Sequence, residues 1–301
     1  MIKKILVSLL ILLIFNSCSK EQFKADIPSY LHISSIDLQT EPTEGSGSSN
    51  FTDAWLTMDG EFLGVFELPA TVPILAYGIH DFRIYAGIKA NGISATRIRY
   101  PFLEVCDLLI SEDDESDMDT SRRISLYRDS TIFIKALTRY SASTNFLLLE
   151  DYEGNEEVMV SSGITDTNFV KVKSEALVYE GASSAAIFLD DTNSFFEILS
   201  SEFTSLNTLY HPTMLELNYR CDHPFRVGVV VKTGESKTFR SFVPYQIKPS
   251  ADWNKIYIDM TYQINLGNSS NEFGIFISAE KSKSIETASF YFDNIKWLHK
   301  K

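Results

Sequence analysis

The stretch "LELNYRCD" (residues 215–222) alternates apolar and polar side chains with a period of two. Successive side chains of a β-strand point to opposite faces, so this pattern predicts a strand with one buried and one polar face. The residues expected on the buried face are Leu215, Leu217, Tyr219 and Cys221. Those expected on the polar face are Glu216, Asn218 and Arg220.

Short runs of this kind recur along the chain between clusters of Gly, Asn, Asp, Ser and Pro, and long helical periodicity is nearly absent. Such a pattern is typical of antiparallel sandwiches. A length of 301 residues fits two domains better than one. The sequence therefore predicts an all-β protein with two antiparallel β-sandwich domains. The clearest further runs are "FRVGVVVK" (225–232), "WNKIYIDM" (253–260) and "EFGIFISAE" (272–280).

The second domain, expected over residues 145–301, opens with "FLLLEDYEG" (146–154) and closes with "SFYFDNIKWL" (289–298). This bracketing resembles the galactose-binding-like jelly roll of carbohydrate-binding modules, and "WNKIYID" resembles a strand near the end of such domains. The resemblance implies a jelly roll that binds a glycan. The alternative is a jelly roll that docks on another envelope protein, because many domains of this fold bind proteins.

The first domain contains "AWLTMDGEFLGVFELP" (54–69), which reads as two strands around a two-residue hairpin turn at Asp59-Gly60. The order of residues over 28–103 resembles the PEGA-type domain, a small β-sandwich of envelope proteins. The resemblance implies a spacer or adhesion module without catalytic residues, in which His80 is structural. The residues that carry it are Asp59, Gly60, Gly64, Pro69, Pro73, Gly78 and His80.

Two segments lack a clear pattern. Residues 104–144 contain strand-like runs and the acidic loop "SEDDESDMD" (111–119), and they either complete the first sandwich or bridge to the second. By composition, "EPTEGSGSSN" (41–50) is a flexible loop.

The N-terminal residues have the order of a secretory signal. Lys3 and Lys4 precede an apolar run from Ile5 to Phe15, which would rise only about 16 Å as a helix, whereas a hydrocarbon core is about 30 Å thick. Residues 1–17 are therefore predicted to be a cleaved signal rather than a spanning helix.

The sequence Phe15-Asn16-Ser17-Cys18 resembles the lipobox of bacterial lipoproteins. The resemblance implies that the Cys18 thiol carries diacylglycerol and that the mature chain begins there, with a tether over 18–27. Ser19-Lys20-Glu21 resembles the export tag of Bacteroidetes surface lipoproteins. The expected location is the outer membrane, with the protein lipid-anchored and facing the cell exterior.

The net charge of the chain limits the classes of partner that it can bind. Removing residues 1–17 takes away Lys3 and Lys4 and no acid, which lowers the formal charge from −13 to −15. An acidic surface repels phosphates, so no nucleic-acid partner is expected.

Cys106 and Cys221 fall in different predicted domains, and Cys221 lies on an apolar strand face. A buried free thiol is therefore preferred to a disulfide.

No catalytic motif is present. The chain has no Gly-x-Ser-x-Gly elbow, no Walker loop and no dinucleotide fingerprint, and its five histidines show no metal-binding spacing. The sequence therefore predicts a protein that is not an enzyme.

The candidate ligand site is the polar face of the predicted strands. In "WNKIYIDM", the apolar Ile256 and Ile258 leave Tyr257 on the opposite face, as Asn218 and Arg220 are on theirs. Sugar recognition uses such planar hydrogen-bonding groups and rings. We expect Asn218, Arg220 and Tyr257 in or beside a glycan groove, with a solvated outer sheet as the alternative.

One structural ion is considered. Jelly rolls that resemble this one often bind calcium where their first and last strands meet, through carboxylates and carbonyls. The acids in those stretches are Asp151, Glu153 and Asp293. The alternative is that they are ordinary surface acids.

Overall fold

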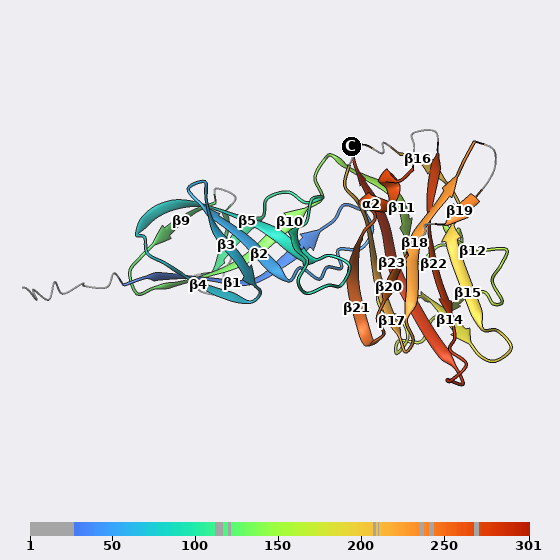
Figure 1. Ribbon diagram of the computed structural model, residues 1–301. Helices are drawn as coiled ribbons and strands as arrows, with labels where there is room; N and C mark the ends of the chain where they lie inside the picture. Colours follow the sequence, from blue (N-terminus) through green and yellow to red (C-terminus); the bar gives the residue numbers. More distant parts are fainter. Residues whose placement is uncertain are drawn as a thin grey trace, which may run out of the picture.

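The computed structural model describes residues 27–301, with gaps at 112–116, 120–121, 207–208, 210, 235–237, 241–243 and 268–270. It consists of two neighbouring β-sandwiches (Figure 1). Among the described residues, one short helix is present, α2 (Thr261–Asn265). The all-β prediction is confirmed. The predicted signal and Cys18 lie outside the described residues. Within the described residues, no helix has the length and apolarity needed to cross a membrane.

The first sandwich has two sheets of five strands each. One follows the order β4-β1-β10-β7-β8. Its strands are β1 (Ser29–Gln39), β4 (Ala70–Ile74), β7 (Asp107–Ser111), β8 (Asp117–Asp119) and β10 (Thr131–Arg139). The other follows β3-β2-β5-β6, with β9 also paired to β5. Its strands are β2 (Asp53–Met58), β3 (Glu61–Glu67), β5 (Gly78–Lys89), β6 (Arg97–Arg99) and β9 (Arg123–Leu126).

Strand β10 changes the predicted organisation of this sandwich. It pairs in parallel with β1, from Tyr30↔Thr131 to Gln39↔Arg139, so the first sandwich is not purely antiparallel. It also occupies the centre of its sheet. A sandwich limited to residues 28–103 would lack this strand, and residues 104–144 complete the first sandwich rather than bridge to the second.

The Asp59-Gly60 turn between β2 and β3 forms as predicted. Both residues have positive φ, 51° and 85°, as a tight hairpin turn requires. The Asp59 carboxylate lies 2.6 Å from Nδ1 of His80 and accepts a hydrogen bond from the backbone of Asp81. This contact raises the pKa of His80 and lowers that of Asp59. The contact between Asp59 and His80 therefore connects the turn to β5, the strand that carries His80.

The second sandwich is antiparallel in every described pair, in the predicted jelly-roll arrangement. One sheet follows the order β13-β14-β23-β17-β21, with β11 also paired to β23. Its strands are β11 (Thr144–Glu150), β13 (Val170–Val172), β14 (Ser184–Leu189), β17 (Thr213–Cys221), β21 (Ser250–Asp259) and β23 (Ala288–Lys300). The facing sheet follows β12-β15-β22-β18-β19. Its strands are β12 (Met159–Ser161), β15 (Phe195–Ser200), β16 (Thr204–Ser205), β18 (Phe225–Lys232), β19 (Thr238–Arg240), β20 (Tyr245–Ile247) and β22 (Glu272–Glu280).

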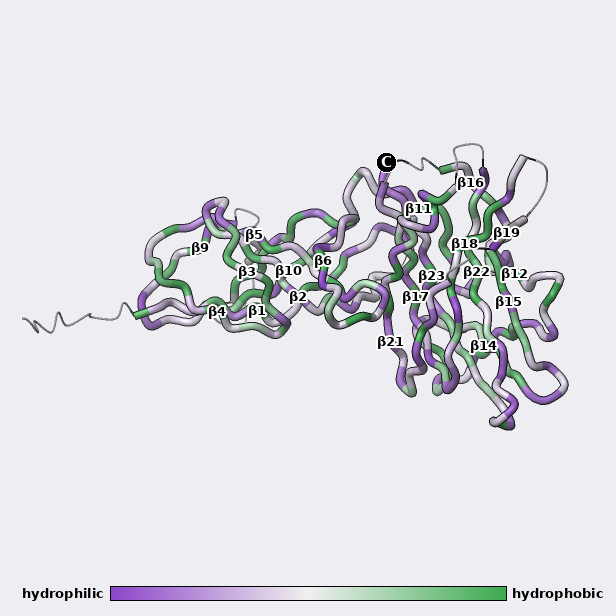
Figure 2. The backbone as a smooth tube through the Cα atoms, viewed as in Figure 1, coloured by the Kyte–Doolittle hydropathy of each residue, from purple (hydrophilic) through white to green (hydrophobic). Residues whose placement is uncertain are grey.

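Strand β17 buries the face that its alternation predicts. Leu215, Leu217, Tyr219 and Cys221 all belong to the core between the two sheets. Hydrophobic and hydrophilic residues alternate in the same way along many strands (Figure 2). Cys106 lies in the core of the first sandwich, and both thiols are free and buried, as predicted. Burial raises their pKa to about 12 for Cys106 and about 11 for Cys221.

The polar face of β17 is covered by the first sandwich. Glu216 is 1% exposed, and its Oε1 accepts hydrogen bonds from the hydroxyls of Tyr100 and Tyr140, the second at 2.9 Å. Nζ of Lys255 lies 3.2 Å from Oε2, and Nζ of Lys296 donates to the Tyr140 hydroxyl at 3.3 Å. We call these five residues the charged seam. It joins the two sandwiches where the hydroxyls of Tyr100 and Tyr140 meet Glu216 and Lys296, and Lys255 compensates the buried carboxylate from within the second sandwich.

Loop 41–50, predicted to be flexible, is pinned into the same interface. The backbone of Asn50 donates to the Tyr257 hydroxyl at 2.9 Å, and the carbonyl of Ser46 accepts from Lys296. Met214, Tyr257 and Leu298 of the second sandwich pack into the hydrophobic core of the first. Composition predicts a loop here but not the surface that orders it.

The charged seam predicts a large loss of stability for Glu216→Ala. Removing one partner of a buried ion pair leaves the lysines uncompensated, which typically costs about 3–5 kcal/mol. The matched control is Glu272→Ala, because Glu272 also lies 3.2 Å from a lysine, Lys232, but both side chains are nearly half exposed. That exposed pair contributes about 1 kcal/mol or less. Urea unfolding monitored by tryptophan fluorescence measures the free energy of unfolding of both variants. Equal losses of stability would contradict the proposed role of the charged seam.

Candidate functional site

On β21, β17 and β23, the outer face of the second sandwich carries three rows of side chains. The pairing of β17 with β21 and β23 sets Glu216 beside Tyr257 and Lys296 in the first row. The second row sets Asn218 beside Lys255 and Asp293. The third contains Arg220 beside Tyr291, and Trp253 lies on the same face of β21 as Lys255 and Tyr257. Side chains opposite one another on neighbouring strands lie about 4.5–5.5 Å apart at Cβ, so each row is continuous.

Only the third row is open to solvent. All members of the first two rows are buried, whereas Trp253, Arg220 and Tyr291 are partly exposed. Cζ of Arg220 lies 4.6 Å from the centre of the Tyr291 ring and 6.0 Å from that of Trp253. The exposed Tyr179, from the loop before β14, lies 5.4 Å from Trp253, ring centre to ring centre. We call these four residues the Arg220 platform.

Hydrogen bonds fix the platform from both sides. The Arg220 guanidinium donates to the carbonyl of Ala176 at 3.0 Å, which holds its plane near the Tyr291 ring. The Tyr179 hydroxyl lies 3.0 Å from Oγ of Ser48, which itself donates to Asn218. Loop 41–50 of the first sandwich therefore helps to position a side chain of the site.

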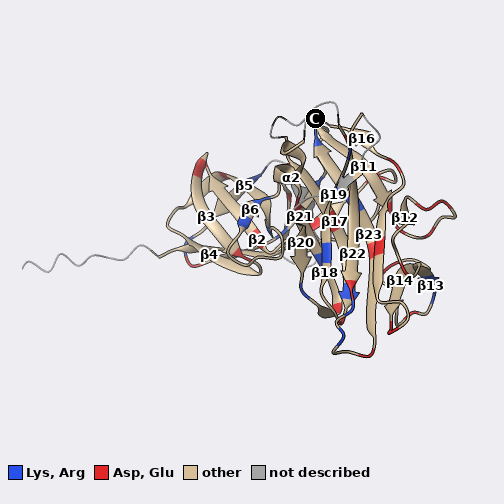
Figure 3. Cartoon of the chain, turned by 45° about the vertical axis from the view of Figure 1, so that its right-hand side comes forward, with Lys and Arg blue, Asp and Glu red and all other residues tan. Residues whose placement is uncertain are grey.

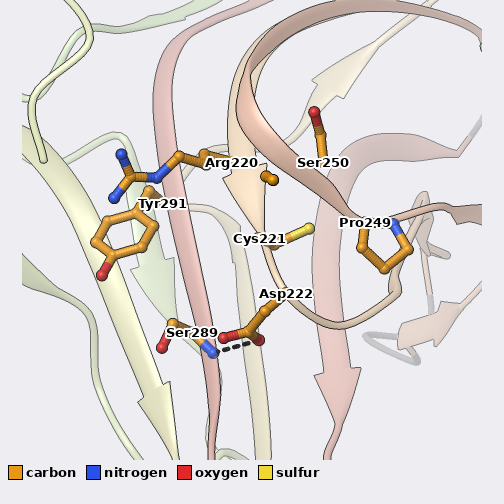
Figure 4. Close-up of a pocket in the computed structure, with 8 residues that line it drawn as sticks. Arg220, Cys221, Asp222, Pro249, Ser250, Ser289 and Tyr291 are labelled. Carbon is orange, nitrogen blue, oxygen red and sulfur yellow. Dashed lines mark hydrogen bonds between the residues drawn. The ribbon is translucent and has the colours of Figure 1, made fainter.

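A pocket of about 510 Å³ adjoins the platform (Figure 4). Figure 4 shows Arg220 and Tyr291 side by side on one wall, and the backbone of Ser289 donates to the Asp222 carboxylate at 2.9 Å. The pocket thus offers a guanidinium, a phenol and a carboxylate together. Its lining residues are Arg220, Cys221, Asp222, Pro249, Ser250, Ala251, Ser289 and Tyr291.

The structure does not bring the three predicted ligand residues into one groove. Arg220 lines the pocket, but Asn218 and Tyr257 are 1% and 3% exposed beneath the first sandwich. The Asn218 side-chain oxygen accepts from Ser48 and the Tyr257 hydroxyl accepts from Asn50, whereas Nδ2 of Asn218 is buried without a hydrogen-bond partner. Burial also raises the pKa of the Tyr257 hydroxyl well above its usual value. The expectation that all three face solvent is therefore wrong for Asn218 and Tyr257.

Three members of the platform, Tyr179, Trp253 and Tyr291, were not predicted, although the sequence contains a signal for the last two. Tyr291 lies between the core residues Phe290 and Phe292, which places it on the outer face. Trp253 lies two positions before Lys255 and four before Tyr257, so it shares their face. Applying the alternation to the ends of β21 and β23 as well identifies both residues as members of the row that is open to solvent.

The predicted calcium ligands do lie close together. Asp151, Glu153 and Asp293 line one pocket of about 300 Å³, together with Glu180. Asp293 is buried, and burial raises the pKa of its carboxyl group to about 6.

One oxygen of Glu153 and both oxygens of Asp293, however, accept hydrogen bonds from the protein itself. Glu153 accepts from the backbone of Ala182 and of Ser183, and Asp293 accepts from the hydroxyl of Ser184 and the backbone of Asn294. Across the described residues, no three His, Cys, Asp or Glu side chains are grouped so that they could hold a metal ion. As they lie, these acids hold strand ends in place, which favours a structural role over a calcium site.

This arrangement predicts that calcium has no effect on stability. The melting temperature of the chain should be the same in millimolar calcium and in chelator, measured by circular dichroism. Binding to the folded state alone would raise it by mass action. A rise with calcium that the chelator reverses would contradict the account, and Glu153→Gln would then show whether this pocket is responsible.

No protein-family model and no curated protein sequence matches the chain. Solved structures of carbohydrate-binding modules are similar in fold. The C-terminal family 22 module of Clostridium thermocellum Xyn10B is 11% identical, with 53% of this chain and 97% of that chain covered and a TM-score of 0.35. The family 11 module of the Clostridium thermocellum cellulase Lic26A-Cel5E is 14% identical, with 53% and 96% covered and a TM-score of 0.38. Scores this low transfer neither a ligand nor a residue role.

Proposed function

We propose that the chain is a non-catalytic glycan-binding protein and that the Arg220 platform holds the sugar. The observation that carries this proposal is the open third row, with Trp253, Arg220 and Tyr291 next to a pocket, while the first two rows are buried. Aromatic rings offer an apolar plane for a pyranose, and a guanidinium offers directed donors for its hydroxyls.

The pocket chemistry supports binding rather than hydrolysis. Glycoside hydrolysis commonly needs two carboxyl groups on either side of the bond. The described residues that line this pocket include one carboxylate, Asp222, which already accepts a hydrogen bond from Ser289. The charges around it are mixed, and Figure 3 shows acidic and basic residues scattered over both sandwiches.

Glycan binding predicts that platform variants lose affinity. On a glycan array, the chain from Cys18 to Lys301 should bind a subset of oligosaccharides. Tyr291→Ala and Trp253→Ala should each weaken that binding about fivefold, because stacking is worth about 1 kcal/mol per ring. Isothermal titration with the selected oligosaccharide measures the loss.

The matched control is Tyr262→Ala, because Tyr262 is 68% exposed on α2 and lies outside the platform. It should bind as wild type does. Unchanged affinity in the Tyr291 and Trp253 variants, with their melting temperatures intact, would move the site elsewhere. A silent array would favour docking on another envelope protein.

We also propose that the protein is a lipoprotein of the outer membrane that faces the cell exterior and is anchored through Cys18. The support is the order of a basic start, a short apolar run and a lipobox-like sequence. The first sandwich then acts as the spacer that its resemblance to PEGA-type domains implies. The described chain begins at the end of that sandwich remote from the second one, which suits such an arrangement (Figure 1).

The anchor predicts fatty-acid labelling that depends on one cysteine. Metabolic labelling should mark the wild-type protein and not Cys18→Ser, because the thioether needs the Cys18 sulfur. Cys221→Ala should keep the label, since that thiol is buried in the core. Equal labelling of the wild type and Cys18→Ser would end the lipoprotein proposal.

A further inference from the structure

The outer end of the first sandwich exposes a cluster of large apolar side chains. Each is between 56% and 73% exposed, although side chains of this kind are usually scattered singly over a surface. We call this cluster the tip patch. Its members are Ile27, Leu75, Tyr77, Ile79 and Tyr127.

The fold itself brings these residues together. Strand β4 ends where β1 begins, with Ile74 paired to Ser29, so Leu75 and the residues after it lie beside Ile27. The Ser29 hydroxyl donates to the carbonyl of Tyr127 at 2.7 Å and to that of Ala76 at 3.3 Å. The start of β5 pairs with the end of β9, which precedes Tyr127 directly. The patch is thus one surface built from three chain segments.

The chemistry of the patch is that of a membrane interface. It combines two tyrosines with aliphatic side chains, and Cζ of Arg128 lies 5.1 Å from the centre of the Tyr77 ring. Tyrosine places its ring among lipid headgroups with its hydroxyl in water, and arginine pairs with anionic lipid phosphates. Figure 2 shows hydrophobic residues at this end, where the described chain begins.

We propose that the tip patch rests on the lipid surface to which the chain is anchored. This inference rests on the proposed lipid anchor. Cys18 is nine residues before Ile27, and nine residues span at most about 30 Å when fully extended. The tether therefore keeps the patch within about a membrane thickness of the bilayer. A short tether raises the effective concentration to about millimolar, so a patch of weak intrinsic affinity is still occupied.

The consequence is attachment at two points rather than one. A lipid anchor alone lets the protein swing about its tether, whereas a docked tip fixes the direction of the first sandwich. Because the charged seam joins the sandwiches, the Arg220 platform is then held away from the bilayer.

The test supplies the anchor chemically. The chain from Cys18 to Lys301 is coupled through the Cys18 thiol to a maleimide lipid in vesicles of phosphatidylethanolamine and phosphatidylglycerol. Cys106 and Cys221 are buried and do not compete for the reagent. Hydroxyl-radical footprinting then compares side-chain labelling on vesicles with the same chain coupled to a soluble maleimide. The outcome does not depend on whether cells lipidate Cys18, so its failure is distinct from failure of the fatty-acid labelling.

Labelling of Tyr77 and Tyr127 should fall at least fivefold on vesicles. Labelling of Tyr262 and Leu266, which are 68% and 65% exposed on the second sandwich, should not change. The double variant Leu75→Ser, Ile79→Ser should lose the protection and keep its melting temperature. Equal labelling of Tyr77 and Tyr127 in both forms would overturn the proposal. Protection of the soluble form that grows with protein concentration would also overturn it, because a second copy of the chain would then cover the patch.

Discussion

The carboxylate of Glu216, buried between two sandwiches, is the constraint on which the arrangement of this molecule depends. A charge removed from water must be compensated by partners, and here these are lysines on β21 and β23 and the hydroxyls of two tyrosines that directly follow β6 and β10. Burial lowers the pKa of Lys296 to about 8, while the charge of Glu216 opposes that change. Separating the sandwiches would break the contacts of Tyr100 and Tyr140 and leave Glu216 paired with Lys255 alone. The seam therefore decides which part of the β17 face is sealed and which stays open.

Local pattern predicts local structure well in this chain. The alternation in "LELNYRCD" predicts both the strand and its buried face, and Asp59-Gly60 predicts a turn that forms with the expected backbone angles. The parallel pairing of β1 with β10 could not be predicted, because about one hundred residues separate the two strands. An alternation with a period of two shows which side chains share a face of a strand. It does not show which strand lies beside that strand.

The same reasoning explains the mixed outcome at the candidate site. Alternation correctly places Asn218, Arg220 and Tyr257 on the face away from the core of the second sandwich, but it does not state whether that face meets water. The first sandwich buries Asn218 and Tyr257 and leaves Arg220 at the edge. Trp253 and Tyr291 belong to the candidate site because they lie in the third row, which the first sandwich does not cover. Loop 41–50 was expected to be flexible for a related reason, since its hydrogen-bond partners belong to a distant part of the chain.

The central claim is that the seam holds the two sandwiches as one rigid body. Spin labels at Glu61→Cys on β3 and Arg226→Cys on β18 would test it directly, because both positions are exposed and lie on different sandwiches. The chain should start at Ser19, so that the remaining native thiols are the buried Cys106 and Cys221. Double electron–electron resonance should give one narrow distance distribution, which broadens in Glu216→Ala. A broad or bimodal distribution in the chain that keeps Glu216 would contradict the account.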